Sequence, residues 1–281
     1  MIVCTFGDRA PLGRLLDQSR DCYDELMVIH DGPDFEDVRS LVEPFGGRFV
    51  ERPRAFSQEP HIPFAIGQAR NDWILRFDTD EYPSTELKEW LREFRRTDDV
   101  DSKIAGYQWI CPAWNGHKRI TENWPHKFVR LFNRNRVSVV GVCENGPQPD
   151  VGYSCPKMRL RFWHEPKTPS HGLRNIFGKP RTDQAKRNLA RALLGSPLDH
   201  PTWRHHTEEW PAGWQDVKEH PVLTALRRVI VWPPRQALAM VIAGDLPRPS
   251  VFFHAGIFHA TVCLEYWRER RAIKKSAKPK C

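Results

Sequence analysis

The sequence lacks several features that would each assign a protein to a distinct class. No window holds the ~18 uninterrupted apolar residues of a membrane-spanning helix, so we expect any membrane contact to be peripheral. Residues 1–6 form too short an apolar run for a signal peptide, and an acid follows soon after. There is no internal repeat and no low-complexity segment, which argues against solenoid and tandem-repeat architectures.

The sequence also lacks the cysteine patterns that stabilise small domains through disulfides or a bound zinc ion. Its 7 cysteines are scattered, odd in number and without a C-x-x-C pair. This usage indicates neither a disulfide framework nor a zinc ribbon, and it fits a reducing compartment. We therefore expect a cytoplasmic protein, with peripheral association at the inner membrane surface as an additional expectation.

Positive charge is in excess. The formal net charge is +8 over 281 residues and the pI is about 9.2, which favours anionic partners such as nucleotide diphosphates, acidic lipids or nucleic acid. Much of this excess lies in residues 268–280. This basic segment is interpreted either as a solvated end or as a membrane-surface contact. The 11 tryptophans suit core packing first and sugar stacking second.

Strand and helix patterns alternate through the first hundred residues. Apolar runs predict strands over 2–6, 25–30, 48–51 and 73–77, and helices over 11–20, 35–44 and after Ser84, a plausible N-cap. Alternation of this kind predicts parallel pairing in a doubly wound sheet. Ligands of such sheets bind at the carboxyl ends of strands, where Thr5, Asp31 and Asp78 fall.

The pattern changes from about residue 104. Short runs at 106–110, 127–132 and 137–142 resemble strands without long helices between them, so the second half of the sheet is expected to be mixed. Helices are predicted over 182–194, 222–231 and 254–271.

The most informative motif is the acid cluster Asp78-Thr79-Asp80-Glu81, directly after an apolar strand. On an extended segment Asp78 and Asp80 would point the same way, because side chains alternate with a period of two. Two carboxylates on one side suit Mg²⁺ or Mn²⁺, which then bridges a substrate diphosphate. A solvated acidic turn is the competing interpretation, since two fixed acids are a weak motif alone.

The segment Trp73-Ile74-Leu75-Arg76-Phe77-Asp78-Thr79-Asp80-Glu81 resembles the donor-site core of family-two glycosyltransferases of the lipopolysaccharide-core type. Arg130-Leu131-Phe132 followed by Val142-Cys143-Glu144 resembles a second family segment, with Cys143 where the family has histidine. The resemblance covers residues 1 to about 180 and only loosely the rest. It implies a GT-A-like (Rossmann-like, doubly wound mixed) sheet in residues 1–180, with a nucleotide-sugar half over 1–104 and an acceptor half over 105–180. Residues 181–281 would form a helical C-terminal extension.

The resemblance also implies a reaction: transfer of a sugar from a nucleoside-diphosphate sugar, with UDP favoured, to an acceptor hydroxyl with inversion. Thr5 and Phe6 would contact the nucleotide base, and Asp31 would bind uridine, although His30 stands where the family usually has a second acid. The acceptor class stays open among glycan, lipid-linked sugar and protein. The implied metal ligands are Asp78, Asp80 and His164, with a structural role for His164 as the alternative.

Two further residues carry predicted roles. Arg70 precedes the fourth strand, and its guanidinium suits a phosphate or uracil contact as well as it suits a plain exposed surface. Glu144 matches the family's catalytic carboxylate and is the expected general base, with Asp150 second and a structural glutamate as the alternative.

Rival functions remain at this stage. A Mg²⁺-dependent phosphatase or nuclease could use the same acids, but the first strand ends in Thr5-Phe6-Gly7 rather than in a nucleophilic aspartate. A non-enzymatic nucleotide or nucleic-acid binding module would account for the positive charge. Nucleic acid is the less favoured partner, because no stretch interleaves basic and aromatic residues as RNA-stacking sheets do.

Overall fold

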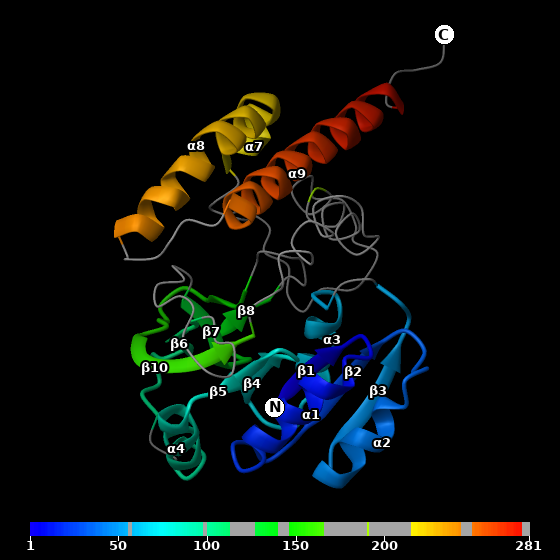
Figure 1. The fold of residues 1–281 in the computed structure, drawn as a ribbon, viewed down its shortest axis with the longest axis vertical. Helices are drawn as coiled ribbons and strands as arrows, with labels where there is room; N and C mark the ends of the chain where they lie inside the picture. The colour runs from blue at the N-terminus through cyan, green and yellow to red at the C-terminus, as the bar shows by residue number, and fades with distance from the viewer. Residues whose placement is uncertain are drawn as a thin grey trace. The chain divides into compact units, whose positions relative to one another are not determined.

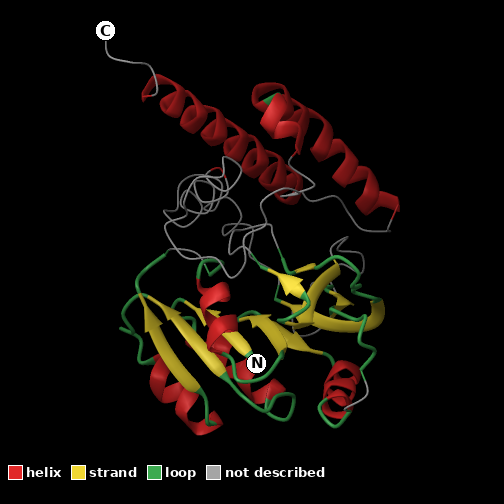
Figure 2. Cartoon of the chain, turned by 180° about the vertical axis from the view of Figure 1, so that it is seen from behind, coloured by secondary structure: helices red, strands yellow, loops and turns green. Residues whose placement is uncertain are grey.

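The computed structural model describes residues 1–55, 58–97, 100–112, 127–139, 146–165, 190, 215–242 and 249–276. By its internal contacts the chain divides into two compact units, one of residues 1–141 with 146–166 and 201–205, the other of residues 142–145, 167–200 and 206–281. Figures 1 and 2 show the ribbon from two opposite sides. The predicted domain boundary at residue 180 lies outside the described residues and stays a prediction.

The first unit is built on a mixed sheet that has eight strands among the described residues, in the order β3-β2-β1-β4-β7-β6-β10-β5. Four neighbours at one end, β1 to β4, pair in parallel, and β7 then runs antiparallel to both β4 and β6. This confirms the predicted α/β fold with a parallel first half and a mixed second half. The strands are β1 Ile2–Thr5, β2 Met27–Asp31, β3 Arg48–Arg52, β4 Trp73–Asp78, β5 Glu81–Pro83, β6 Gly106–Ile110, β7 Lys127–Asn133 and β10 Lys157–His164.

Helices cover both faces of this sheet. Successive side chains of a strand point to opposite faces, and apolar side chains on both faces need a covering layer. On one face Val3 and Val28 pack with the apolar side of α1 (Arg9–Ser19) and with residues of α2 (Val38–Val42) and α4 (Thr85–Phe94). On the other face Ile2 and Ile29 pack with α3 (His61–Gln68), which Figure 2 shows in front of the sheet. The Ser84 Oγ accepts the Leu87 N–H at 3.2 Å, so the predicted N-cap of α4 is confirmed.

The sheet must curl, because β4 and β5 are consecutive in sequence but lie four places apart in the strand order. Four strand spacings would span roughly 19 Å in a flat sheet. The three residue steps from Asp78 to Glu81 reach at most about 10 Å. The curl therefore folds the β10–β5 edge back toward the end of β4, and β5 pairs with β10 in antiparallel register with His164 opposite Glu81.

The second unit is described here by its helices α7 (Gln215–Glu219), α8 (Pro221–Ile242) and α9 (Pro249–Ser276). Buried Val217, Ala225 and Val262 contribute to its core, and Arg228 forms a salt bridge with Asp216 at 3.2 Å. No described helix combines the length and apolarity needed to cross a bilayer.

Several predicted boundaries differ from the structure. The helix predicted to end at 231 continues through Pro233 and Pro234, and the one predicted over 254–271 is longer at both ends. The strand predicted over 137–142 is limited to β8 (Val137–Ser138) in its described part, where it pairs with β9 (Gln148–Pro149). The helix predicted over 182–194 lies outside the described residues except for Ala190.

Candidate functional site

The carboxyl ends of β1, β2 and β4 lie side by side, because these strands are parallel neighbours. Thr5 ends β1 and is fully buried, and its Oγ1 accepts the backbone N–H of Gly7 at 3.3 Å. Gly7 has a φ of +105°, a conformation that suits glycine. The chain therefore turns sharply after β1, with half-buried Phe6 inside the turn. The structure thus brings the predicted base-contact residues to the expected edge of the sheet.

Asp31 ends β2 at the same edge, but its carboxylate has internal partners. Its Oδ1 accepts the backbone N–H of Ala55 and lies 2.8 Å from the Nε2 of His61, the first residue of α3. Asp31 is only 2% exposed and the His61 side chain is fully buried. The contacts of Asp31 with Ala55 and His61 hold the β3–α3 connection against the end of β2. The predicted contact of Asp31 with uridine stays a prediction.

The acid cluster lies where β4 passes into β5. The extended segment ends at Asp78, and Thr79 and Asp80 form a turn, so the prediction that Asp78 and Asp80 share one side of an extended segment was wrong. The turn sends the two acids to different partners. Asp78 accepts hydrogen bonds from Arg76 at 2.9 Å and from Arg130 at 3.0 Å.

Glu81 lies beneath this turn and is 1% exposed. Its Oε2 accepts the backbone N–H of Asp78 at 2.9 Å, and its Oε1 pairs with the Arg130 guanidinium. Burial raises the pKa of Glu81 to about 7, while Arg130 acts in the opposite direction. Burial also lowers the pKa of Arg130, but the carboxylates of Asp78 and Glu81 outweigh that effect and keep the guanidinium charged. Arg130 is thus a cation shared by two of the three acids, and Arg76 adds a second positive charge beside Asp78.

The third acid, Asp80, lies beside His164, with 3.4 Å between Asp80 Oδ2 and His164 Nε2. Both side chains are about one quarter exposed, so solvent reaches them. The Glu165 N–H donates to the Asp80 carbonyl at 2.9 Å and holds the end of β10 against the turn. The structure therefore brings Asp80 and His164 together from positions distant in sequence.

These residues fit a divalent ion in part. A carboxylate oxygen and an imidazole nitrogen within reach of one another suit Mn²⁺ or a similar ion, whereas Asp78 is already engaged by two arginines. In the described part of the chain, Asp78, Asp80 and His164 do not bring three ligand atoms within 4.8 Å of one another, and the group that does is His30, Asp34 and Glu36. The predicted ligand roles stay predictions.

The remaining predicted residues lie elsewhere or are not described. Arg70 precedes β4 at its amino end, is 81% exposed, and lies 3.9 Å from Glu25, so the structure does not bring it to the acid cluster. Asp150 accepts the Ser138 hydroxyl at 2.6 Å beside the β8–β9 pair. Glu144 lies outside the described residues.

Two residues that sequence reasoning assigned no role organise the site. Arg130 is a basic residue within an apolar strand, and a buried arginine requires an anionic partner, so this pattern is the signal that could have identified it. His61 followed a proline and gave no periodic signal, so neither α3 nor its pairing with Asp31 was predicted.

Sequence comparison finds distant relatives, and no family profile matches the chain. An uncharacterized glycosyltransferase of Rickettsia typhi is 21% identical over 153 residues, covering 54% of this chain and 52% of the relative. One of Rickettsia felis is 22% identical over 153 residues, covering 54% of this chain and 53% of the relative. The chain thus spans about half the length of the curated relatives it matches.

Structure comparison gives a weaker likeness. The crystal structure of residues 1–349 of S. aureus TarS in complex with UDP-GlcNAc has 10% sequence identity and a TM-score of 0.45, covering 95% of this chain and 91% of that one. A TM-score this low assigns neither fold nor function to this chain.

Proposed function

We propose that this protein is a glycosyltransferase that moves a sugar from a nucleoside-diphosphate sugar, with UDP favoured, to an acceptor hydroxyl with inversion. The observation that carries the proposal is the pairing of Asp80 with His164 beside Asp78, at the edge of the sheet where Thr5 also ends its strand. The distant similarity to named glycosyltransferases over 153 residues supports it. The acceptor class, whether glycan, lipid-linked sugar or protein, is part of the proposal that experiments must resolve.

A donor diphosphate needs positive charge on its departing oxygens. Asp80 and His164 are the residues that would hold Mn²⁺ or Mg²⁺, and such an ion would stabilise the leaving diphosphate. Arg76 and Arg130 surround Asp78 with positive charge, so Asp78 acts as their anchor as well as a donor-site carboxylate. The general base is proposed to be Glu144.

A direct test uses a panel of sugar nucleotides with Mn²⁺. We expect one nucleoside-diphosphate sugar to raise the Tm in a metal-dependent manner and to be hydrolysed slowly without acceptor. A response to oligonucleotides with none to any sugar nucleotide would contradict the proposal and favour a nucleic-acid binding module. Phosphate release from simple monoesters instead would favour a phosphatase.

The base assignment has its own test. Glu144→Gln keeps the size of the side chain and one acceptor oxygen but removes its basicity, so we expect donor binding to persist and transfer to fall at least about 100-fold. Asp150→Asn is the matched comparison. If Glu144→Gln transfers sugar at the wild-type rate, Glu144 is not the base.

A peripheral lipid contact is a separate part of the proposal. On α8, Leu223, Leu226 and Ile230 are exposed at spacings that place them on one helix face. Basic side chains such as Arg227 lie beside them, and the end of α9 is rich in arginine and lysine. We expect the protein to sediment with anionic vesicles more than with zwitterionic ones, and replacement of the three apolar residues by serine to abolish this. Equal sedimentation with both vesicle types would contradict an electrostatic contact.

A further inference from the structure

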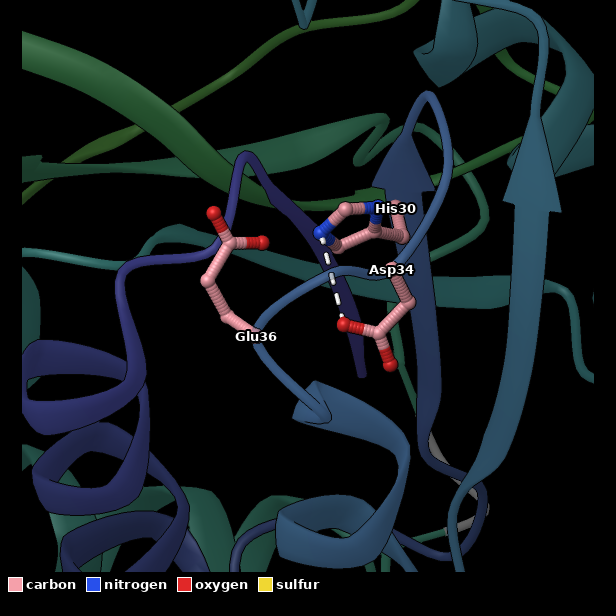
Figure 3. A group of neighbouring side chains, drawn as sticks. All are labelled: His30, Asp34 and Glu36. Carbon is pink, nitrogen blue, oxygen red and sulfur yellow. Dashed lines mark ion pairs between the residues drawn. The ribbon is translucent and has the colours of Figure 1, made fainter.

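A second group of potential metal ligands lies at the carboxyl end of β2, apart from the acid cluster. His30 belongs to β2, and Asp34 and Glu36 follow it in the connection to α2. Their ligand atoms all lie within 4.8 Å of one another. In Figure 3 the carboxylates of Asp34 and Glu36 lie on either side of the imidazole edge of His30.

The hydrogen bonding of His30 leaves one ring nitrogen available. The side chain is fully buried, and its Nδ1 lies 2.8 Å from the carbonyl oxygen of Gly32. A carbonyl oxygen only accepts, so Nδ1 carries the proton of this bond. Within the described part of the chain Nε2 is buried without a hydrogen-bond partner. Metal-binding histidines show this arrangement, with one nitrogen donating to a backbone carbonyl and the other facing the ion.

Asp34 is held in place by the backbone of α2. Its Oδ1 accepts the N–H of Val38 at 2.8 Å, and its Oδ2 accepts the N–H of Arg39 at 2.9 Å. Each carboxylate oxygen has a second acceptor site, so these bonds orient the group without saturating it. The 3.9 Å between His30 Nε2 and Asp34 Oδ1 is slightly more than the roughly 3.4 Å that separates two ligands of a tetrahedral zinc ion.

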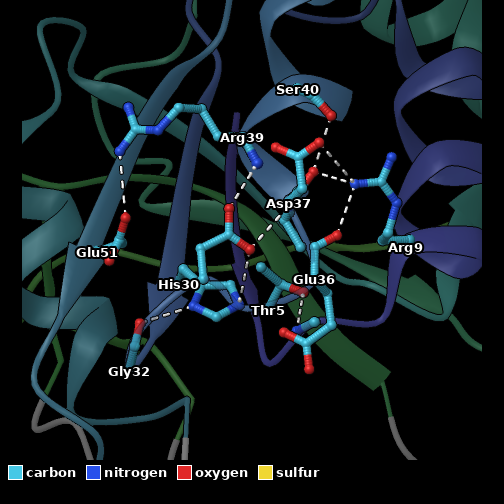
Figure 4. A network of polar contacts seen from close by, with 12 residues as sticks. Thr5, Arg9, His30, Gly32, Glu36, Asp37, Arg39, Ser40 and Glu51 are labelled. Carbon is cyan, nitrogen blue, oxygen red and sulfur yellow. Dashed lines mark hydrogen bonds and ion pairs between the residues drawn. The ribbon is translucent and has the colours of Figure 1, made fainter.

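Glu36 supplies the third ligand, on an exposed side chain. Among the described residues no basic side chain comes within 4.0 Å of its carboxylate, because Arg9 bonds instead to the backbone carbonyls of Glu36 and Asp37 (Figure 4). The carboxylate occupies space left by Gly7, where an added Cβ would come within 2.8 Å of the Glu36 Cδ. Glu36 is exposed, which gives an ion and its water a route to the group.

We propose that His30, Asp34 and Glu36 bind one divalent transition-metal ion. An imidazole nitrogen with two carboxylates favours an ion of the zinc type over Mg²⁺ or Ca²⁺, which prefer oxygen ligands throughout. With three protein ligands, the fourth position of a tetrahedral ion is open. Water, or a molecule bound at the neighbouring Thr5 turn, could occupy it. This proposed site does not rest on the proposed transferase activity.

The test is a Zn²⁺ titration of the full chain in competition with a chelating dye, together with the Tm in Zn²⁺ and in EDTA. We expect Glu36→Gln to lose one bound equivalent, or to weaken it at least about tenfold, because a charged ligand becomes a neutral amide. Asp37→Asn is the matched control. It removes the adjacent exposed acid, and asparagine tolerates the φ of 53° at that position, so zinc binding should be unchanged.

Two more variants complete the design. His30→Leu should lose the same equivalent, whereas Asp80→Asn should keep it, which separates this ion from any held by the acid cluster. Glu36 is exposed, so its substitution tests the site even if His30→Leu does not fold. Wild-type protein that binds no Zn²⁺, or Glu36→Gln that matches the wild type in stoichiometry and affinity, would overturn the proposal.

Discussion

His164 Nε2 lies 3.4 Å from Asp80 Oδ2, where β10 pairs antiparallel with β5 just after the turn that follows β4. This pair gives the first prediction. Asp80→Asn and His164→Ala should each reduce Mn²⁺-dependent binding of a nucleoside diphosphate by about 10-fold or more, because each removes one ligand. Calorimetric titration in Mn²⁺ and in EDTA measures this. Asp72→Asn, an exposed acid at the amino end of β4, should bind like the wild type. Unchanged affinity in both site variants would contradict a metal role.

A second prediction concerns the buried guanidinium. Arg130→Met leaves the Glu81 and Asp78 carboxylates without their shared cation, which we expect to lower the free energy of unfolding by about 3–5 kcal/mol. Arg92→Met is the matched control, since its exposed pair with Asp21 should contribute no more than about 1 kcal/mol. Urea unfolding measures both variants. Equal losses would show that the burial of the Arg130 pair adds nothing.

The raised pKa of Glu81 predicts a pH dependence. The folded chain binds this proton more tightly than the unfolded chain, with a pKa of about 7 against the usual 4.5. Its contribution to stability is therefore complete below pH 4.5 and is lost as the pH rises through 7. Relative to Glu81→Gln, the wild type should lose at most about 3 kcal/mol over that interval. Urea unfolding of both proteins across this pH range measures the difference, and parallel curves would show that Arg130 keeps Glu81 ionised throughout.

The N-cap of α4 provides a fourth prediction. Ser84→Ala removes the acceptor of the Leu87 N–H and should cost about 1 kcal/mol of unfolding free energy. Ser40→Ala removes an exposed hydroxyl that donates to the Asp37 carbonyl, and its cost should stay within about 0.5 kcal/mol. Tryptophan fluorescence during urea unfolding can report both. A larger loss from the Ser40 variant would mean that capping is not what Ser84 contributes.

Local patterns predicted the parallel half of the sheet well. The run ending at Thr5 is buried at every position, and the run ending at Asp78 is apolar from Trp73 to Phe77 except at Arg76, so apolar sequence predicted both strands directly. Ser84 was recognised because capping depends only on neighbours within one turn. The amino-acid sequence alone therefore assigns the residues at these strand ends to one edge of the sheet.

Long-range pairing could not be predicted in the same way. That Arg130 would lie between Asp78 and Glu81 depends on β7 running antiparallel to β4, which no local pattern encodes. The turn at Asp80 was not predicted because Asp78 and Asp80 were placed on one extended segment, although aspartate favours turns over strands. The end of α8 was predicted too early because Pro233 follows residue 231, and proline ends a helix far more often than it lies inside one.

The curled sheet has a consequence for how the protein is made. Residues 1–83 supply β1 to β5, and β1 to β4 can pair as soon as they leave the ribosome, but β5 pairs with β10, whose residues 157–164 are synthesised much later. Closing that long loop costs entropy before any contact repays it. The contact between Asp80 and His164 therefore cannot form until residues 157–164 have been synthesised, so a shorter nascent chain would hold only part of the acid-cluster site.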